Sequence, residues 1–315
     1  MSNNNHYPTW NPNEAAIKAS EGRWGLPNVY TNVYKNNCMI FRQGGYTTFE
    51  GKEVKLPGDD DPMLEGTKVY SKPFDVNEKP VVTEETLTYV VNADSFETAK
   101  TLIDEGLNPA VLNLASARHA GGGYPSGSRA QEESLCRQST LARSLYPYYD
   151  EKLSKANGVT FRFKAYPLDT LNGGVYSPHV TVFRKQSEMC RLMEEPFQTA
   201  VISVAALSFQ PEKGKDLSYH DPETDGFNEA GLSVMLEKIR TIFRIGLDNG
   251  HDSLVLGAFG CGAYRLRPDL VAPLFQQVMQ EPEFCNKYKV ITFAILDKRS
   301  SSHKFEPFYQ LFDRK

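Results

Sequence analysis

Apolar and polar residues follow two different periods along most of the chain. Continuous apolar runs of strand length are typical of strands that are covered on both faces. Such runs are LTYVVN, AVLNLA, VTVF, AVISVAAL, SLVLGAF and KVITFAIL. Segments with apolar residues at helical spacing lie between several of them. Strands that alternate with helices predict an α/β fold with a largely parallel sheet between helical layers, in which ligands bind at the carboxyl ends of the strands.

Four helices are predicted from this spacing and from capping residues. The first opens at Asp94, with Glu97 completing a capping box, and closes at Gly106. The second covers roughly Gln131 to Leu145, and its expected buried stripe is Leu135, Leu141, Ala142 and Leu145. The third ends near Gly250, and its expected stripe is Leu232, Leu236, Ile239, Ile242 and Phe243. The fourth covers RPDLVAPLFQQVM, with Pro268 in its first turn.

The beginning of the chain differs from the rest. It is rich in Asn, Tyr, Pro and Gly, with a short helix expected around Asn13 to Gly22 and little periodicity after it. The acidic segment PGDDDP is suited to a boundary. We therefore predict an N-terminal extension over residues 1–78, packed on a main domain over residues 79–315. The aromatic residues of the extension are interpreted as packing anchors rather than a ligand-binding box; they are Trp10, Trp24, Tyr30 and Tyr34.

Composition narrows the classes of function. The 315 residues carry a formal net charge of −4, which argues against a broad basic surface for nucleic acid, so we expect no direct DNA binding. The five cysteines lack a CxxC pair, and no two histidines have the helical spacing of metal ligands, so we predict no disulfide framework, no metal and no cofactor. Neither a secretory leader nor a membrane-spanning run is evident. The expectation is a soluble intracellular protein, cytoplasmic or nuclear, that acts as a monomer without a membrane partner.

Two glycine-rich loops follow predicted strands. The first, GGGYPSGS, comes after the strand that contains Asn113, and the second, GAFGCGAYR, comes after SLVL. Glycines allow positive φ and let backbone N–H groups approach a ligand closely, which suits a diphosphate. Neither loop matches a Walker A motif or a dinucleotide fingerprint. In the first loop Gly127 is followed by Ser128 and Arg129, and the second loop lacks the third glycine of the G-x-G-x-x-G fingerprint. A pair of tight turns without a ligand is the alternative.

Two adjacent glutamates follow the first loop. Glu132 and Glu133 lie in the first turn of the predicted helix, where the helix dipole alone favours a carboxylate by about 0.3–1 kcal/mol. Taken by themselves they indicate helix capping.

The order of Asn113, GGG, seven further residues and QEE resembles the signature of poly(ADP-ribose) glycohydrolases of the microbial type. The blocks AVLNLASARHAGGG, GVYSPHVTVFR, EEPFQTAVISVAAL, HDSLVLGAFGCGAY and ITFAILD extend the resemblance over about Leu87 to Asp297. It implies a three-layer α/β/α macrodomain with a mixed, largely parallel sheet, preceded by an N-terminal extension.

The resemblance also implies a pocket for the terminal ADP-ribose of a polymer. Glu133 matches the catalytic glutamate, Glu132 matches a neighbour that contacts ribose hydroxyls, and Asn113 and Gln131 would orient these groups. The residues expected at the diphosphate and distal ribose are Gly121, Gly122, Gly123, Gly260, Cys261, Gly262, Ala263 and Tyr264. The chain departs from the family at His119-Ala120, where Asn-Pro is common, and we interpret His119 as a solvent-facing loop residue.

The implied reaction is hydrolysis of ribose–ribose bonds, which releases ADP-ribose and reverses ADP-ribosylation, as in the DNA damage response. Most glycosidases place two carboxyl groups across the bond, and adjacent helical residues cannot do so, so one working acid, Glu133, is predicted. The expected partners are poly(ADP-ribose) and ADP-ribosylated proteins. The alternatives are a macrodomain that binds ADP-ribose without turnover, a hydrolase of mono-ADP-ribosylated proteins, and, less favoured, a hydrolase with Cys261 as nucleophile.

Overall fold

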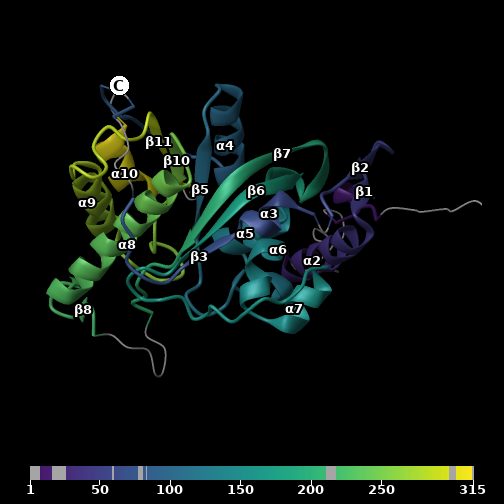
Figure 1. Ribbon diagram of the computed structural model, residues 1–315, viewed down its shortest axis with the longest axis horizontal. Coiled ribbons are helices and arrows are strands. Elements are labelled where there is room, and N and C mark those ends of the chain that lie inside the picture. The colour runs from purple at the N-terminus through teal and green to yellow at the C-terminus, as the bar shows by residue number, and fades with distance from the viewer. Residues whose placement is uncertain are drawn as a thin grey trace, which may run out of the picture. The chain divides into compact units, whose positions relative to one another are not determined.

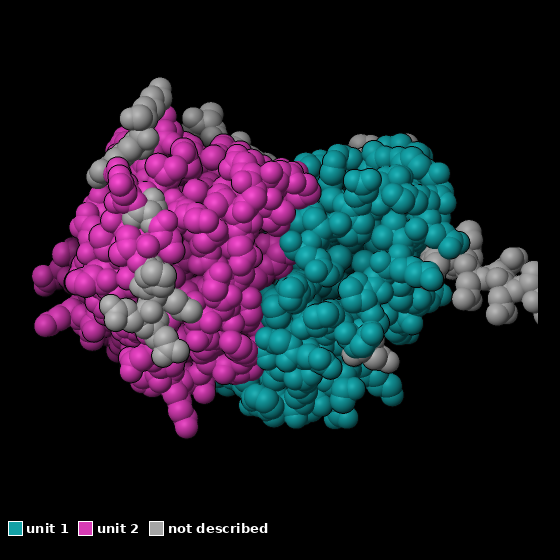
Figure 2. Space-filling model, turned by 45° about the horizontal axis from the view of Figure 1, so that its top comes forward, with its two compact units in different colours: residues 1–67, 118–167, 177–198 teal, residues 68–117, 168–176, 199–315 magenta. Residues whose placement is uncertain are grey.

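The computed structural model describes residues 8–15, 26–58, 60–76, 81–82, 84–210, 218–297 and 303–313. The chain divides into two compact units, shown in different colours in Figure 2. Unit 1 comprises residues 1–67, 118–167 and 177–198, and unit 2 comprises residues 68–117, 168–176 and 199–315. The units are interleaved along the sequence, so they are not the two consecutive segments 1–78 and 79–315. That linear division stays a prediction.

The strands of the large sheet follow the order β3-β6-β7-β5-β10-β11-β4. Their bounds are β3 Lys68–Tyr70, β4 Leu87–Val91, β5 Pro109–Leu114, β6 Gly174–Lys185, β7 Arg191–Val204, β10 Ser253–Leu256 and β11 Val290–Ala294 (Figure 1). The pairs β4–β11, β11–β10, β10–β5 and β5–β7 are parallel, and β3 pairs with β6 in the antiparallel direction. The prediction of a mixed, largely parallel sheet is confirmed. Strands β6 and β7 begin and end in different units, because their residues 177–185 and 191–198 belong to unit 1.

Helices cover both faces of the sheet in unit 2. They are α4 Ser95–Asp104, α8 Glu229–Asp248, α9 Pro268–Met279 and α10 Phe305–Phe312. Parallel strands are joined by right-handed crossovers. The connections β7–α8–β10 and β10–α9–β11 run along the sheet in one direction, whereas β4–α4–β5 runs in the other. Helices α8 and α9 therefore lie on one face and α4 on the opposite face, as expected for a three-layer fold.

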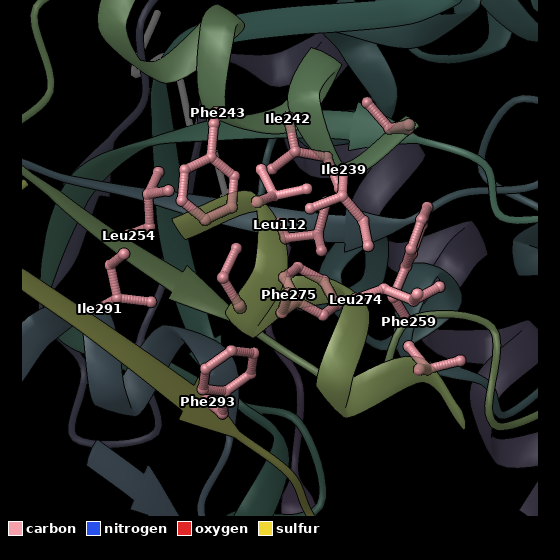
Figure 3. Close-up of a cluster of buried hydrophobic side chains, with 14 of the residues drawn as sticks. Leu112, Ile239, Ile242, Phe243, Leu254, Phe259, Leu274, Phe275, Ile291 and Phe293 are labelled. Carbon is pink, nitrogen blue, oxygen red and sulfur yellow. The ribbon is translucent and has the colours of Figure 1, made fainter. Parts of the chain in front are cut away.

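One apolar cluster fills the space between the sheet and helices α8, α9 and α10. Figure 3 shows side chains of this cluster pointing toward one another, among them Leu112, Leu254 and Phe293 of the sheet and Phe243 and Phe275 of helices α8 and α9. Strand residues two apart share this face, so the intervening residues point toward the α4 side. The cluster fixes the strands whose carboxyl ends carry the loops considered below.

The helix signals of unit 2 are largely confirmed. Helix α4 begins after Asp94, whose side chain accepts a hydrogen bond from the N–H of Phe96, and Gly106 follows it with φ +82°. Helix α9 begins at Pro268. One position was wrong: Leu232 is exposed, whereas Leu236, Ile239, Ile242 and Phe243 are buried. Leu232 lies in the first turn of α8, outside the part of the helix that contacts the core.

In unit 1 the structure corrects two expectations. An 18-residue helix, α2 Leu26–Gln43, occupies a segment predicted to have little periodicity. The expected helix from Gln131 to Leu145 is two helices, α5 Gln131–Gln138 and α6 Leu141–Leu145. The break arises because Ser139 forms a bridge with Val182 of β6 and Thr140 exchanges hydrogen bonds with Thr181. The predicted stripe Leu135, Leu141, Ala142 and Leu145 is buried as expected.

The other elements are short. In unit 1 they are β1 Gly45–Thr47, β2 Glu53–Lys55, α3 Pro62–Gly66, η1 Tyr124–Ser126, η2 Tyr146–Tyr148, α7 Glu151–Ala156 and η3 Gln186–Glu188. In unit 2, β8 His220–Asp221 pairs with β9 Gly226–Phe227. Trp10 packs on a small apolar cluster of unit 1, as a packing anchor should. Trp24 and most of the helix expected around Asn13 to Gly22 lie outside the described residues. No helix in the described ranges is long and apolar enough to cross a membrane.

Candidate active site

The first glycine loop is bonded directly to the two glutamates. The N–H of Gly121 donates to Glu132 Oε1 over 3.0 Å, and the N–H of Gly123 donates to Glu133 Oε1 over 2.8 Å. The N–H of Gly122 donates to the carbonyl oxygen of His119 over 2.9 Å. Hydrogen bonds to an ionised acceptor are shorter and stronger than neutral ones. The loop therefore holds both carboxylates in fixed positions at the start of α5.

Gly122 has no room for a side chain. Its φ is +54°, and a Cβ built on it would lie 2.3 Å from Glu133 Oε1 and 3.2 Å from Glu132 Oε2. Gly121 also has positive φ, +72°, which glycine adopts without strain. Adjacent side chains on a helix point away from one another. Here both carboxylates nevertheless reach the same glycine, because the loop folds back over the first turn of α5.

The two carboxylates differ in their remaining contacts. Glu132 is 3 % exposed and Glu133 is 7 % exposed. Glu133 Oε2 is buried and has no hydrogen-bond partner among the described residues. An unpartnered buried polar atom is costly and is found in proteins mainly where a ligand or water completes the site. Glu133 thus carries one oxygen fixed by the loop and a second one available to a reacting group.

Buried phenols surround the glutamates. Tyr146 and Tyr166 are each almost fully buried, and the structure provides neither hydroxyl with a hydrogen-bond partner in its described part. The Tyr146 hydroxyl lies 3.3 Å from the position of a Cβ on Gly121. Burial, and then the charge of Glu132, raise the pKa of Tyr166 well above its usual value, and burial does the same for the pKa of Tyr146. Both phenols therefore stay neutral and keep a proton to donate.

Two residues flank the glycine loop and the glutamates, and the orienting role expected of Gln131 stays a prediction. His119 is exposed, as its interpretation as a loop residue predicts, and its ring contacts the edge of Tyr149. Tyr149 in turn contacts the ring of Tyr166. Gln131 begins α5 and is partly exposed. The sequence analysis did not single out the tyrosines, although the segment SLYPYY, which begins at the end of α6, is unusually aromatic and could have been a signal.

The N–H groups of the first loop were expected to bind a diphosphate. In the structure all three of them donate to acceptors of the chain itself, namely Glu132, Glu133 and the carbonyl of His119. The loop therefore positions the carboxylates. A direct contact of Gly121, Gly122 or Gly123 with a diphosphate stays a prediction.

The second glycine loop begins at the carboxyl end of β10 in unit 2. Gly260 has φ +76°, and a Cβ there would lie 2.4 Å from Leu266 Cδ1, so glycine is required. Gly262 and Ala263 are exposed, and their N–H groups donate to no acceptor within the described residues. A turn with outward N–H groups at a strand end is suited to an anion. Of the two glycine loops, the second is therefore the one whose backbone N–H groups can donate to a bound anion.

Cys261 lies in this loop with its side chain turned inward. It is 5 % exposed, and its Sγ contacts the carbonyl oxygen of Phe259. Burial raises the pKa of the Cys261 thiol to about 12. Only the thiolate is nucleophilic, so the side chain is inert at neutral pH. This counts against the alternative with Cys261 as nucleophile.

Tyr264 joins the second loop to the end of β5. Its hydroxyl donates to the carbonyl oxygen of Ala115 and accepts from the N–H of Ala117, each over 3.3 Å. Asn113 is fully buried on β5, where its Nδ2 donates to Ser203 Oγ over 3.0 Å. In unit 2, Asn113 and the loop of residues 260–264 thus lie at the ends of neighbouring parallel strands. In unit 1, the loop of residues 121–123 lies against Glu132 and Glu133. Contacts of these residues with substrate stay predictions.

Comparison with known proteins identifies the class of catalytic domain. Residues 35–185 match the family model described as Microbial-type PARG, catalytic domain, where PARG stands for poly(ADP-ribose) glycohydrolase. This segment contains α2, the first glycine loop and both glutamates. Over residues 35–185 the chain is therefore similar to microbial-type PARG catalytic domains. The chain is accordingly a hydrolase of the glycosidase class.

Solved PARG structures resemble the chain over most of its length. A poly(ADP-ribose) glycohydrolase from Thermomonospora curvata, bound to the inhibitor ADP-HPD, is 28% identical, with 90% of this chain and 99% of that chain covered and a TM-score of 0.69. The enzyme from Deinococcus radiodurans, in complex with ADP-ribose, is 25% identical, with 82% and 99% covered and a TM-score of 0.61. No curated protein matches the chain. Within the described residues, no group of three or more His, Cys, Asp or Glu side chains is arranged to bind a metal ion.

Proposed function

We propose that the chain hydrolyses the ribose–ribose glycosidic bonds of poly(ADP-ribose) and releases ADP-ribose, with Glu133 as general acid and then general base. The observation that carries this proposal is the environment of Glu133: one oxygen bonded to the Gly123 N–H and the other buried without a partner. The match of residues 35–185 to the PARG family model and the ADP-ribose complex of the Deinococcus enzyme support the substrate.

The reaction needs a proton at the leaving oxygen while the sugar develops oxocarbenium character. Protonated Glu133 donates that proton as the C–O bond breaks, and its carboxylate then takes a proton from the water that attacks the anomeric carbon. The Gly123 N–H stabilises the carboxylate formed between these steps. Glu132, oriented by the Gly121 N–H, binds ribose hydroxyls.

The second loop supplies the anion site of this proposal. The exposed N–H groups of Gly262 and Ala263 bind the diphosphate of the terminal ADP-ribose, and Tyr264 packs on its distal ribose. Backbone donors bind a diphosphate without a lysine, which is consistent with the net charge of −4. ADP-ribosylated proteins are partners only as carriers of the polymer.

The test compares Glu133→Gln with wild type, because glutamine keeps an oxygen that can accept from the Gly123 N–H but cannot transfer a proton. We expect ADP-ribose release from polymer to fall about 10²- to 10⁴-fold. ADP-ribose affinity, measured by calorimetry, should change little. The matched control is Glu188→Gln, since Glu188 is an exposed carboxylate of unit 1 that pairs with Lys185. It should keep wild-type turnover.

Three outcomes would overturn the proposal. Equal turnover by Glu133→Gln and wild type removes Glu133 from the chemistry. ADP-ribose binding by wild type without release from polymer indicates a binding domain without turnover. Release from a mono-ADP-ribosylated protein but not from polymer indicates a hydrolase of the single modification.

A further inference from the structure

Helix α2 carries a fully buried asparagine that contacts the loop and the helix of the candidate site. Asn37 lies on the face of α2 that also buries Val29, Val33 and Ile40. Asparagine is a poor residue for a helix interior, and a buried amide costs free energy unless its hydrogen bonds are made. An asparagine in this position therefore calls for a physical reason.

The Asn37 amide is fully bonded. Its Nδ2 donates to the Tyr124 hydroxyl over 2.7 Å and to the carbonyl oxygen of Arg137 over 3.0 Å. Its Oδ1 accepts from Arg184 Nε over 2.7 Å. A primary amide nitrogen has two protons, and here each has one acceptor. No residue without both a double donor and an acceptor could make this set of bonds.

The two acceptors belong to the two halves of the candidate site. Tyr124 directly follows Gly123, whose N–H donates to Glu133, and Arg137 lies one helical turn after Glu133 on α5. One nitrogen atom therefore joins the end of the glycine loop to the helix that carries Glu133. Other residues of α2 support the same parts: the Tyr34 ring contacts the edge of Tyr124, and Tyr30 lies under the Arg137 guanidinium at 4.0 Å.

Arg184 of β6 orients the amide. It is fully buried, donates to Asn37 Oδ1, to Asn36 Oδ1 and to the carbonyl oxygen of Cys190, and burial lowers its pKa to about 10. Arg184 stays charged at neutral pH and has only donors, so the amide oxygen of Asn37, and not the amide nitrogen, faces it. The amide nitrogen is thereby directed at Tyr124 and Arg137.

We propose that Asn37 is a positioning residue for Glu133, which fixes the spacing between the glycine loop and α5 through Tyr124 and Arg137. This inference gives helix α2 a role in the reaction, and it rests on the proposed function. A shift of about 1 Å at a reacting group can cost about 100-fold in rate. Loss of the spacing weakens the hydrogen bond from the Gly123 N–H and so moves the Glu133 carboxylate away from its fixed position.

The test uses Asn37→Asp, which keeps the acceptor for Arg184 and loses both donors. We expect kcat on poly(ADP-ribose) to fall about 10- to 100-fold, with ADP-ribose affinity within about twofold of wild type. The loss should appear in kcat while KM for the polymer changes little, because the spacing holds the reacting carboxylate and not the substrate. Tyr124→Phe removes one of the two bonds and should give a smaller change in the same direction.

The matched control is Asn157→Asp. Asn157 is also fully buried in unit 1, and its Nδ2 donates to the carbonyl oxygen of Leu153 on α7 rather than to the glycine loop or α5. Its Oδ1 accepts from Cys38 of α2, and aspartate keeps that acceptor. Asn157→Asp should lose stability and keep a kcat close to that of wild type. A wild-type kcat in Asn37→Asp, or an equal loss of kcat in Asn157→Asp, would overturn the inference, whereas turnover by the wild-type protein would leave the proposed function intact. If Asn37→Asp does not fold, a wild-type kcat in Tyr124→Phe overturns the inference. If the wild-type protein shows no turnover on poly(ADP-ribose), both the proposed function and the role of Asn37 are wrong.

Discussion

A Cβ on Gly122 would lie 2.3 Å from Glu133 Oε1, so this glycine and this glutamate cannot both be kept if residue 122 gains a side chain. We predict that Gly122→Ala lowers turnover on poly(ADP-ribose) by at least about 100-fold, because the carboxylate must move away from its hydrogen bond with Gly123. The positive φ adds about 1–2 kcal/mol of strain. Steady-state kinetics and thermal denaturation measure the two effects separately.

The control is Gly44→Ala. Gly44 also belongs to unit 1 and has φ +74°, but nothing lies within 4 Å of a Cβ built on it. It should show a similar loss of stability and wild-type turnover. If both variants lose activity equally, backbone strain and not the contact with Glu133 is responsible.

The sequence predicts the sheet well because each strand is a local apolar run, and the run itself reports burial on both faces. VITFA of β11 is buried at every position, as its composition predicts. Helix α2 was missed for a physical reason: the stripe Val29, Val33, Asn37 and Ile40 contains a polar residue, so its apolar period is broken at the position that supports the candidate site.

The glutamates could be found from the order of residues, and their partners could not. The spacing of GGG and QEE is local, whereas the Asn37 amide meets Arg184 across 147 positions of sequence. The break between α5 and α6 depends likewise on β6, whose pairing with Ser139 no local propensity reports. Long-range hydrogen bonds leave no periodic trace, and so they required coordinates.

The ion pair of Asp61 and Arg143 should carry a large share of the stability of unit 1. Its atoms Oδ2 and Nη1 are 3.3 Å apart, and the side chains are 1 % and 2 % exposed. Asp61→Asn keeps an oxygen for the N–H of Met63 but leaves the guanidinium without a counter-charge. We expect the free energy of unfolding to fall by about 3–5 kcal/mol in urea denaturation. Glu188→Gln, which breaks two exposed pairs, with Lys185 and with Arg191, should cost at most about 1 kcal/mol for each pair.

Cysteine modification should be confined to one position of the native protein. Cys285 is exposed, whereas the other four are buried, and burial raises the pKa of each of those thiols: Cys38, Cys136, Cys190 and Cys261. With iodoacetamide near about pH 8, peptide mapping should find Cys285 alkylated and the others intact, because the thiolate is the reacting form. Turnover should survive. Rapid alkylation of Cys261 with loss of turnover would restore its candidacy as nucleophile.

A buried lysine should make stability depend on pH at the alkaline side. Lys238 of α8 is 4 % exposed, and burial lowers its pKa from 10.5 to about 8, although Asp169 raises it. Between these two values the unfolded chain binds more protons at this position than the native one, so stability rises with pH across that window. Below about pH 8 both states are protonated and the full cost, about 3 kcal/mol, is present.

Replacing Lys238 removes this cost, so Lys238→Met should be more stable than wild type by an amount that depends on pH. Urea denaturation should give a gain of about 3 kcal/mol near about pH 7, falling toward zero near about pH 10.5, because deprotonated lysine no longer carries the charge that burial penalises. Lys100→Met is the control, since Lys100 is 42% exposed on α4 and pairs with Asp104. It should show no such slope. A gain for Lys238→Met that is constant over this range would mean that the pKa of Lys238 is the same in the native and the unfolded chain, so that burial imposes no cost on its charge.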